Sequence, residues 1–502
     1  MRRLTAALAI ACALTCAATA SAVDFGANDD IGKYAADGGA TFFAQMAEIG
    51  MKQNVMTVRW TPGSTAIPEQ EYLDRAVPAA IAAGIKPTFA VYPYPPRQIE
   101  DGTATPAGFG DWLRAVAAAY PQVTTYIVGN EPNLNTFWRP QGDGTGTILS
   151  GATFGPFLAA GYDALKAVSA DITVLGVGSS PRGDRAPGAG GKASPVHFLD
   201  ALGDWYRASN RQTPLMDGYS FHPYPNPSDF TVPFTFTYSW PNAGLHELAR
   251  VKQGLWDAFD GTPQATTVSG LKLYLDEVGW QVTADPSLGY TGSENVKVTS
   301  EETQATIYDQ LIRHVVCDPT VAQLNFFGYW DDHALDGWQS ALRRVDGSER
   351  ASNAAVGAAI AATGGRCAGA LRSWKPLTKP DGATVTFAKI VGTKTQKRTF
   401  AFNPTAAEDV TVKAGLVPAK TPVARIPALL ADAGSVHAYR KRTLKVTATP
   451  RPGAQVLAVV LAAELNPKRV AVFTSPTFTP VDTLAAAKRK AKGKKAQAKA
   501  PR

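Results

Sequence analysis

Short apolar runs alternate with longer amphipathic stretches from residue 23 to about residue 365. Runs rich in β-branched and aromatic residues, bounded by Gly, Pro, Asn or Asp, are typical of buried strands. The stretches between them repeat apolar residues at helical spacing. This pattern predicts strands at 23–26, 55–60, 86–92, 124–128, 172–177, 218–222, 272–276 and 323–330. It predicts helices at 41–50, 71–83, 108–120, 154–169, 196–209, 244–259, 301–316 and 353–362.

The alternation of strands and helices indicates the α/β class. Eight strand–helix units in roughly 340 residues fit a (β/α)8 TIM barrel. A doubly wound open sheet is the alternative, and it should carry a glycine-rich phosphate turn after its first strand. The sequence FGANDD at 25–30 is not such a turn. We therefore predict a catalytic-type barrel over 23–366.

The pattern changes after residue 366. Short alternating segments separated by Gly and Pro predict a small C-terminal β-sandwich over 367–473, since turns recur every few residues. Such a domain either packs on the barrel or acts as a carbohydrate-binding module. It has no tryptophan after Trp374, which favours packing, because a stacking platform would be poorly supplied. The expected strands are 384–390, 398–403, 409–413, 436–439, 443–447 and 455–460.

The N-terminus combines two arginines, an apolar run to about Cys16 and an Ala-Ser-Ala site. This is the pattern of a signal peptide, here over 1–22, and a retained N-terminal anchor is the alternative. The apolar run is short for a membrane span, and no later run reaches roughly 20 residues. We therefore expect a secreted or cell-surface protein without a transmembrane segment. Cys317 and Cys367 would remain as a disulfide in that oxidising compartment, with two unpaired thiols as the alternative.

The net charge of +8 is concentrated at the chain ends. Eight basic residues and no acid lie in 484–502, and subtracting these and the two signal-peptide arginines leaves −2. The body is not basic, so nucleic acid is not an expected partner. The Ala/Lys-rich segment 474–502 lacks a core-forming pattern and is expected to be a disordered tail. It would either contact anionic cell-wall polymers or only solubilise the chain.

Two predicted strands lead into a glutamate. The stretch 124–133 reads TTYIVGNEPN, with Glu131 just past the strand, and 271–280 reads LKLYLDEVGW, with Glu277 at the strand tip. Active sites of barrels lie at the C-terminal ends of the strands. Two carboxylates there suit hydrolysis of a glycosidic bond, because one protonates the leaving oxygen while the other attacks or activates water. Two solvated loop glutamates are the alternative.

Polar and aromatic residues gather at the other strand ends. Flat sugar rings stack on aromatic faces, so this composition predicts a saccharide cleft, although each aromatic is also a candidate loop anchor. No zinc-ligand spacing is present, and we expect no metal and no cofactor. For Asp331, Asp332 and His333, contact with substrate hydroxyls or calcium competes with a solvated loop, which we favour. The strand-end residues are Arg59, Trp60, Tyr92, Tyr94, Asn130, Ser179, His222, Tyr224 and Trp330, with Trp138, Trp240, Trp280 and Trp338 in adjoining loops.

This ordered set resembles the clan A glycoside hydrolases over residues 24–365, most closely family 5, with family 39 as a neighbour. The resemblance implies that Glu131 is the acid/base and Glu277 the nucleophile. It implies hydrogen bonds from Arg59 and Tyr224 to the nucleophile, and a sugar 2-hydroxyl held by Asn130. The family's usual histidine at the end of strand 3 is missing, with Tyr92 and Tyr94 in its place. The predicted substrate-binding residues are Arg59, Tyr92, Asn130, His222, Tyr224, Trp280 and Trp330, and the resemblance implies that Trp330 is the floor of the −1 subsite.

We therefore predict a secreted retaining β-glycosidase that acts on a polysaccharide or oligosaccharide. A non-catalytic saccharide-binding barrel and a wall-associated structural protein are the alternatives. Repulsion from Glu277 should raise the pKa of Glu131, while Arg59 keeps Glu277 ionised. Asp276 points to the other strand face and is expected to be a structural partner. The two carboxyl groups should lie about 5–5.5 Å apart, the spacing of retaining enzymes.

Overall fold

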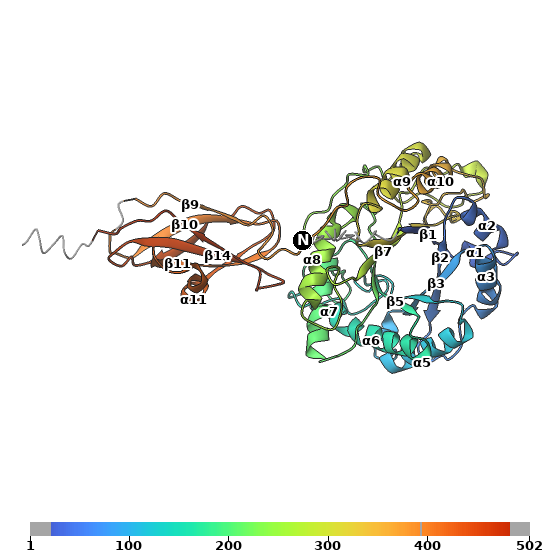
Figure 1. Ribbon diagram of the computed structural model, residues 1–502, viewed down its shortest axis with the longest axis horizontal. Coiled ribbons are helices and arrows are strands. Elements are labelled where there is room, and N and C mark those ends of the chain that lie inside the picture. Colours follow the sequence, from blue (N-terminus) through green and yellow to red (C-terminus); the bar gives the residue numbers. More distant parts are fainter. Residues whose placement is uncertain (1–21, 392–393, 482–502) are drawn as a thin grey trace, which may run out of the picture.

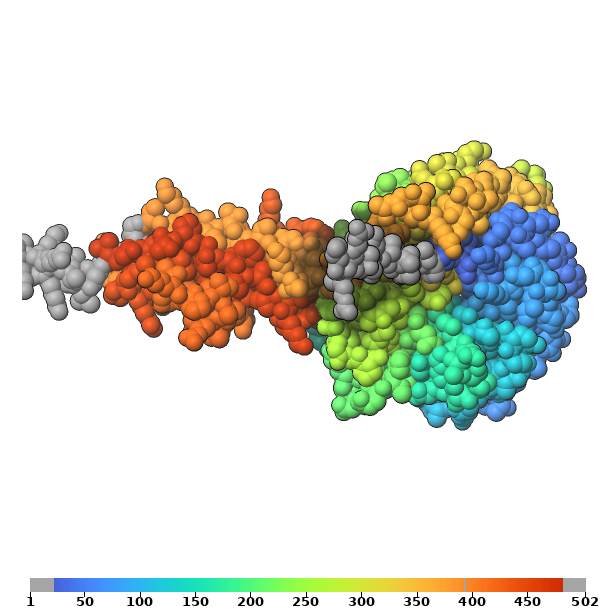
Figure 2. Space-filling view, viewed as in Figure 1, coloured from blue at the N-terminus to red at the C-terminus, as the bar shows by residue number. Residues whose placement is uncertain are grey.

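The computed structural model describes residues 22–391 and 394–481. The expected signal peptide up to residue 21 and the segment 482–502 lie outside these described residues. Figure 1 shows two bodies, a round barrel of strands ringed by helices and an elongated β domain attached to its side. The space-filling view shows that the β domain extends away from the barrel and meets it at one end (Figure 2).

The first body is a closed barrel of eight strands in sequential order, which confirms the predicted fold class. All neighbouring strands are parallel, and pairing of β1 with β8 closes the barrel. The C-terminal strand ends therefore converge on one rim, where the two candidate glutamates are expected. The strands are β1 (Asp24–Asn28), β2 (Gln53–Trp60), β3 (Lys86–Pro93), β4 (Thr125–Val128), β5 (Thr173–Ser179), β6 (Gly218–Phe221), β7 (Lys272–Val278) and β8 (Val321–Phe327).

A ring of helices covers the outside of the barrel (Figure 1). Several begin where a side chain caps the first turn, as Thr105, Ser194 and Ser300 do by accepting from a backbone N–H three residues on. The two four-residue helices were not predicted, because one turn is too short to show a periodic pattern. The helices are α1 (Ile31–Tyr34), α2 (Ala40–Glu48), α3 (Gln70–Ala82), α4 (Arg97–Glu100), α5 (Pro106–Ala119), α6 (Ser150–Val168), α7 (Pro195–Ala208), α8 (Leu248–Phe259), α9 (Glu301–Val315) and α10 (Ala351–Thr363), with 3-10 turns η1 (Leu245–Glu247) and η2 (Pro286–Leu288).

The second body is built from two antiparallel sheets, ordered β13-β10-β9 and β12-β11-β14-β15, which confirms the expected sandwich. Alternate residues such as Phe400, Phe402, Leu457 and Val459 point into its core. The strands are β9 (Thr384–Phe387), β10 (Arg398–Thr405), β11 (Val410–Pro418), β12 (Ala431–Val436), β13 (Leu444–Ala448), β14 (Gln455–Ala463) and β15 (Val470–Thr474), with η3 (Val423–Arg425) and α11 (Ile426–Leu429) before β12.

The predicted start of the tail at residue 474 is too early. Ser475 and Phe478 are buried on the sandwich, and Phe478 exchanges two backbone hydrogen bonds with Gln455. The hydrophobic period of β15 and the isolated Phe478 were overlooked because the Ala/Lys-rich composition further on dominated the pattern. The packed domain therefore extends through these residues.

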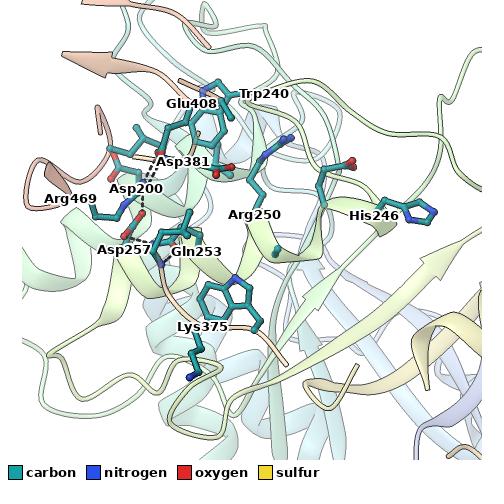
Figure 3. Close-up of a pocket in the computed structure, with 18 residues that line it drawn as sticks. Asp200, Trp240, His246, Arg250, Gln253, Asp257, Lys375, Asp381, Glu408 and Arg469 are labelled. Carbon is teal, nitrogen blue, oxygen red and sulfur yellow. Dashed lines mark hydrogen bonds and ion pairs between the residues drawn. The ribbon is translucent and has the colours of Figure 1, made fainter. Parts of the chain in front are cut away.

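Buried ion pairs join the sandwich to the barrel. The Arg469 guanidinium donates to both carboxylate oxygens of Glu408 at 2.6 Å and lies 3.0 Å from Asp257 on α8. Arg185, from the loop after β5, pairs with Asp409 of the sandwich. A cavity of about 390 Å³ lies at this junction (Figure 3). The sandwich thus meets the side of the barrel, at α8 and at the loop after β5.

The predicted disulfide between Cys317 and Cys367 is confirmed. It joins the chain just after α9 to the chain just after α10, 50 residues on, with Cα atoms 4.6 Å apart. The bridge therefore ties the end of the seventh strand–helix unit of the barrel to the connector that leads to the sandwich. Among the described residues, no helix has the length and apolarity that crossing a membrane would require.

Candidate active site

A cavity of about 540 Å³ opens at the C-terminal ends of the barrel strands. Glu131, from the loop after β4, and Glu277, on β7, both line it. The parallel strands bring these side chains together although 146 positions separate them in sequence, since 277 − 131 = 146. Other lining residues include Asn28, Arg59, Tyr92, Asn130, Tyr224, Phe327 and Trp338.

The backbone fixes the position of Glu131. Gly129 ends β4 with a φ of 112°, and Glu131 itself has a φ of 41°, a left-handed conformation uncommon for a residue with a side chain. Its N–H donates to the carbonyl of Gly178 at 2.7 Å, and its carbonyl accepts from Leu134 at 2.8 Å. The buried Asn133 side chain adds bonds to the loop after β5. Strain of this kind persists only where neighbouring contacts enforce it.

Two donors face the carboxylate of Glu277. Asn28, at the end of β1, donates through Nδ2 at 3.1 Å, and the Tyr224 hydroxyl donates at 3.1 Å. The side chain of Glu277 is only 12% exposed. Hydrogen bonds to a carboxylate favour its ionised form, so both donors stabilise the anion.

A buried histidine connects the two glutamates. His222 Nδ1 lies 3.2 Å from Glu131 Oε1 and 3.3 Å from Glu277 Oε2. These two oxygens are therefore at most about 6.5 Å apart, the sum of the two distances. On the other side of the ring, Nε2 lies 3.3 Å from Asp276, which accepts from the Ser220 hydroxyl at 2.5 Å. Asp276 thus orients the imidazole, in line with its predicted structural role.

The buried carboxylates and the histidine shift each other's pKa. Burial raises the pKa of Glu277 to about 8, with opposition from His222 and reinforcement from Glu131 and Asp276. Burial lowers the pKa of His222, but attraction to the three carboxylates outweighs it, so this pKa lies well above its usual value. The cluster therefore keeps a proton among its carboxylates at neutral pH that isolated carboxylates would lose.

Several sequence-predicted residues lie where they were expected. Tyr92, Asn130 and Tyr224 line the cavity, and His222 lies beneath it in contact with both glutamates. Burial, followed by repulsion from the two glutamates, raises the pKa of Tyr224 well above its usual value. The phenol therefore stays protonated and remains a hydrogen-bond donor.

Arg59 does not make the hydrogen bond that the family resemblance implies. It lines the cavity, but its guanidinium lies over the Tyr94 ring, 5.4 Å from the centroid. Within the described chain no hydrogen bond or ion pair joins it to Glu277. Asn28 takes that place, and sequence reasoning missed it because FGANDD was tested only as a phosphate turn. Its position at the end of β1 was the available signal.

The prediction that Trp330 lines the cavity is wrong. Strand β8 ends at Phe327 rather than at residue 330, so Trp330 lies in the following loop, and its indole donates to Gln45 at 3.3 Å. Trp338, later in the same loop, lines the cavity and packs against Tyr224. The sequence showed both tryptophans but not how the loop returns to the cavity.

Two further expectations were wrong. Trp280 is buried, with its indole N–H donating to the carbonyl of Val232 at 3.2 Å, and it anchors a loop outside the cavity. Asp331 is not solvated, because it is buried against Arg350 and accepts from the Tyr290 hydroxyl at 2.6 Å. Asp332 and His333 are exposed. In the described residues, no group of His, Cys, Asp or Glu is arranged to hold a metal ion.

Comparison with known proteins gives similar structures only. No protein-family profile matches the chain, and no curated protein matches its sequence. Similar structures include a family 39 glycoside hydrolase from Bacteroides cellulosilyticus WH2, with 17% identity, TM-score 0.45, and coverage of 85% of this chain and 79% of that one. They also include a glucosidase from Croceicoccus marinus (14% identity, TM-score 0.44, coverage 80% and 77%) and an endo-1,4-β-mannanase from Rhizomucor miehei (13%, 0.42, 68% and 94%). Similarity of this extent assigns neither reaction nor substrate, which have to be argued from the site.

Proposed function

We propose that the protein is a retaining β-glycosidase that hydrolyses O-glycosidic bonds of a polysaccharide or oligosaccharide by double displacement. The observation that supports this most directly is the contact of one imidazole nitrogen with both Glu131 and Glu277 across the cavity. Carboxyl groups about 5–5.5 Å apart are typical of retaining enzymes, whereas inverting enzymes separate them by about 6.5–9.5 Å to admit a water. An upper limit of about 6.5 Å between the facing oxygens favours the retaining arrangement.

The surroundings of each carboxylate support distinct roles. Asn28 and Tyr224 donate to Glu277 and stabilise its anion, which suits this residue to the role of nucleophile. Glu131 then protonates the leaving oxygen while Glu277 attacks the anomeric carbon. Formation of the glycosyl ester removes the charge of Glu277, so Glu131 loses its proton and activates water.

The cost of this arrangement argues against a binding-only barrel. Three carboxylates held around one buried histidine repel one another and lose hydration. Saccharide binding needs neither a shared proton nor a buried anion, because hydroxyl groups can be bound by neutral partners. A general acid and a nucleophile require both.

The test uses Glu277→Ala, Glu131→Ala and, as a matched control, Glu302→Ala, a surface carboxylate at the start of α9. A screen of β-glucans, mannans, galactans and xylans first identifies a cleaved substrate, from which a dinitrophenyl glycoside is chosen. Glu277→Ala should be inactive, and azide should restore turnover with an inverted glycosyl azide. Glu131→Ala should release dinitrophenolate rapidly but deglycosylate about 10²–10⁴-fold more slowly, and azide should yield the retained product.

Each alternative outcome has a definite meaning. An inverted azide from Glu131→Ala would show that the two roles are exchanged. Wild-type activity in both variants, matching Glu302→Ala, would place the catalytic site elsewhere and reject the proposal.

Secretion is part of the same proposal. The signal-like N-terminus supports it, and a disulfide between Cys317 and Cys367 is the kind of bond that persists in oxidising compartments. Expression of the full gene should release a protein whose first residue lies near Val23. Recovery of an intact N-terminus from the cell interior would contradict it.

A further inference from the structure

Three cationic side chains line the same cavity as the two glutamates. Arg59 extends from the end of β2, while Arg182 and Lys192 both come from the loop after β5. Arg182 and Lys192 are half-buried, and Arg59 is more exposed. Beyond the catalytic cluster the cavity wall therefore carries these three cations and one carboxylate, Asp30, which pairs with Lys33.

None of these three cations forms an ion pair within 4.0 Å in the described part of the chain, although Arg59 lies near enough to Glu69 to contribute to the lowered pKa of that carboxyl. Arg59 lies over the Tyr94 ring, and no ion pair within 4.0 Å involves Arg182 or Lys192. The catalytic carboxylates are not their partners either, since His222, Asn28 and Tyr224 make the side-chain contacts there.

The fully buried cations of the described chain are all paired with carboxylates. Lys33 lies against two carboxylates, Lys252 pairs with Asp318, and the fully buried Arg350 pairs with Asp331. Removing a cation from water is costly unless an anion compensates it. Cations left without a partner at a cavity wall are therefore suited to an anionic group of the ligand.

Backbone contacts hold the loop that carries Arg182 and Lys192. The N–H of Asp184 donates to the carbonyl of Lys192 at 2.7 Å, and Gly183 donates to Asn242 at 2.8 Å. The backbone of Lys192 also pairs with that of Leu134, three residues after Glu131. The two cations are thus positioned in advance beside the Glu131 wall, which reduces the entropy lost on binding.

We propose that these cations form a subsite for an acidic sugar, so that the substrate is a β-linked saccharide with carboxylate or sulfate groups. This rests on the proposed glycosidase function. The guanidinium groups suit bidentate recognition of a planar carboxylate, and the lysine adds a point charge. Arg182 and Lys192 line the same cavity as Glu131, on a loop that pairs with the Glu131 loop at Leu134, and the proton of Glu131 goes to the glycosidic oxygen. The acidic sugar therefore lies next to the bond that is cleaved.

The test measures binding separately from catalysis. The inactive Glu277→Gln chain is titrated calorimetrically with β-1,3-glucan, β-1,4-glucan and β-1,4-xylan oligosaccharides, each in neutral, carboxylated and sulfated form. At least one acidic form should bind about tenfold or more tightly than its neutral parent at low salt, and the advantage should shrink as salt screens the charges. The preferred acidic form identifies carboxylate or sulfate as the recognised group.

Variants of the cations test whether Arg182 and Lys192 bind the acidic group. Adding either Arg182→Gln or Lys192→Gln to the Glu277→Gln chain should weaken binding of the preferred acidic form by about 10- to 100-fold. This is the range for the loss of a hydrogen bond to a charged group. Lys52→Gln is the matched control, because it removes one positive charge just before β2, at the opposite end of the barrel. Every chain keeps the basic segment 482–502, so its attraction for polyanions cancels in the comparison.

The outcomes separate this inference from the proposed function. Equal affinity for acidic and neutral forms, or equal loss in the cation variants and Lys52→Gln, would overturn the subsite even if wild-type protein cleaves glycosides. Selective loss in the cation variants supports the subsite, even if the wild-type protein cleaves none of the panel and the proposed function fails. Where the wild-type protein cleaves both the acidic and the neutral form of an oligosaccharide, the ratio of their kcat/KM values gives a second readout.

Discussion

The strand-end cavity and the domain junction both gather arginine, carboxylate and aromatic side chains, but they treat charge in opposite ways. At the junction, Arg469 lies between Glu408 and Asp257, and dashed contacts join all three (Figure 3). In the strand-end cavity, two carboxylates share one histidine, and the cations on its walls have no carboxylate partner within the described residues.

This difference shows why cavity shape alone does not identify function in this chain. The junction cavity measures about 390 Å³ and the strand-end cavity about 540 Å³, and indole groups border both. At the junction burial raises the pKa of Asp200 to about 7, but the ion pairs of Arg469 are compensated within the chain, which indicates an interface whose role is packing. Carboxylates with shifted pKa and cations without partners indicate a site that interacts with a ligand.

The largest expected effect concerns the catalytic cluster. Glu277→Gln should lower kcat/KM on the order of 10⁴-fold or more, because no glycosyl ester can form. The same change should make stability less dependent on pH. Burial raises the pKa of Glu277 from the ordinary 4.5 to about 8. Between these two pH values the folded protein therefore holds a proton that the unfolded chain releases.

The sign of this pH effect follows from linkage. The stabilising contribution of the proton that this buried cluster holds is fully present below about pH 4.5 and is lost as pH rises through about 8. The wild-type melting temperature should therefore fall between pH 5 and pH 9 more steeply than that of Glu277→Gln. Parallel melting curves for the two proteins would contradict the buried, proton-holding cluster.

The next effect tests the junction as a structural interface. Arg469→Met leaves Glu408 and Asp257 buried without a cation, which should cost about 3–5 kcal/mol of stability. Scanning calorimetry should show a lower transition or separate transitions of the two domains. Activity measured well below that transition should persist, because Arg469, Glu408 and Asp257 do not line the strand-end cavity.

The matched control for Arg469 is an exposed pair. Lys297→Met removes a lysine that is 73% exposed and pairs with Asp229, and exposed pairs contribute only about 0–1 kcal/mol. If the two variants lose the same stability, the buried network is not what holds the domains together. If Arg469→Met abolishes activity while the chain stays folded, the contrast between the two cavities fails.

The sequence predicted the fold well because its signals are local. The apolar runs of β2, β3 and β7 and the helices between them were placed to within a few residues, since strand and helix periods are visible in short windows. Glu131 and Glu277 were found for the same reason, as each ends such a run. Asn28 was missed because one asparagine after a short strand carries no pattern of its own.

Loop residues could not be placed in this way. Trp280, Trp330 and Trp338 all follow strand ends, and sequence spacing treats them alike. Their positions depend on how the loops fold back, through contacts such as those of Trp280 with Val232 and Trp330 with Gln45. The unpaired state of Arg182 and Lys192 was likewise invisible, because pairing is a property of the folded surroundings.

A smaller effect separates Asn28 from Arg59. Asn28→Ala removes a donor to Glu277 and should lower kcat about 10- to 100-fold, the range for a hydrogen bond to a charged group. The acidic limb of the pH profile should move to higher pH, because the anion of Glu277 loses stabilisation. Arg59→Ala, which removes no such contact, should leave that limb in place. A shift of the limb in Arg59→Ala instead would restore the role that the family resemblance implied.

The smallest expected effect compares two tryptophans of one loop. Trp338 lines the cavity and packs on Tyr224 with ring centroids 5.0 Å apart, whereas Trp330 lies outside the lining and donates to Gln45. Loss of an aromatic contact is worth about 0.5–1.5 kcal/mol beyond buried area, so Trp338→Ala should raise KM about 2- to 12-fold. Trp338→Phe, which keeps a ring beside Tyr224, should recover part of that loss.

Trp330→Ala should lower the melting temperature while KM stays closer to wild type, because its ring packs against Phe42 rather than the cavity. Steady-state kinetics and melting curves on the three variants check this, and a larger rise of KM in Trp330→Ala than in Trp338→Ala would show that the substrate lies over the other tryptophan.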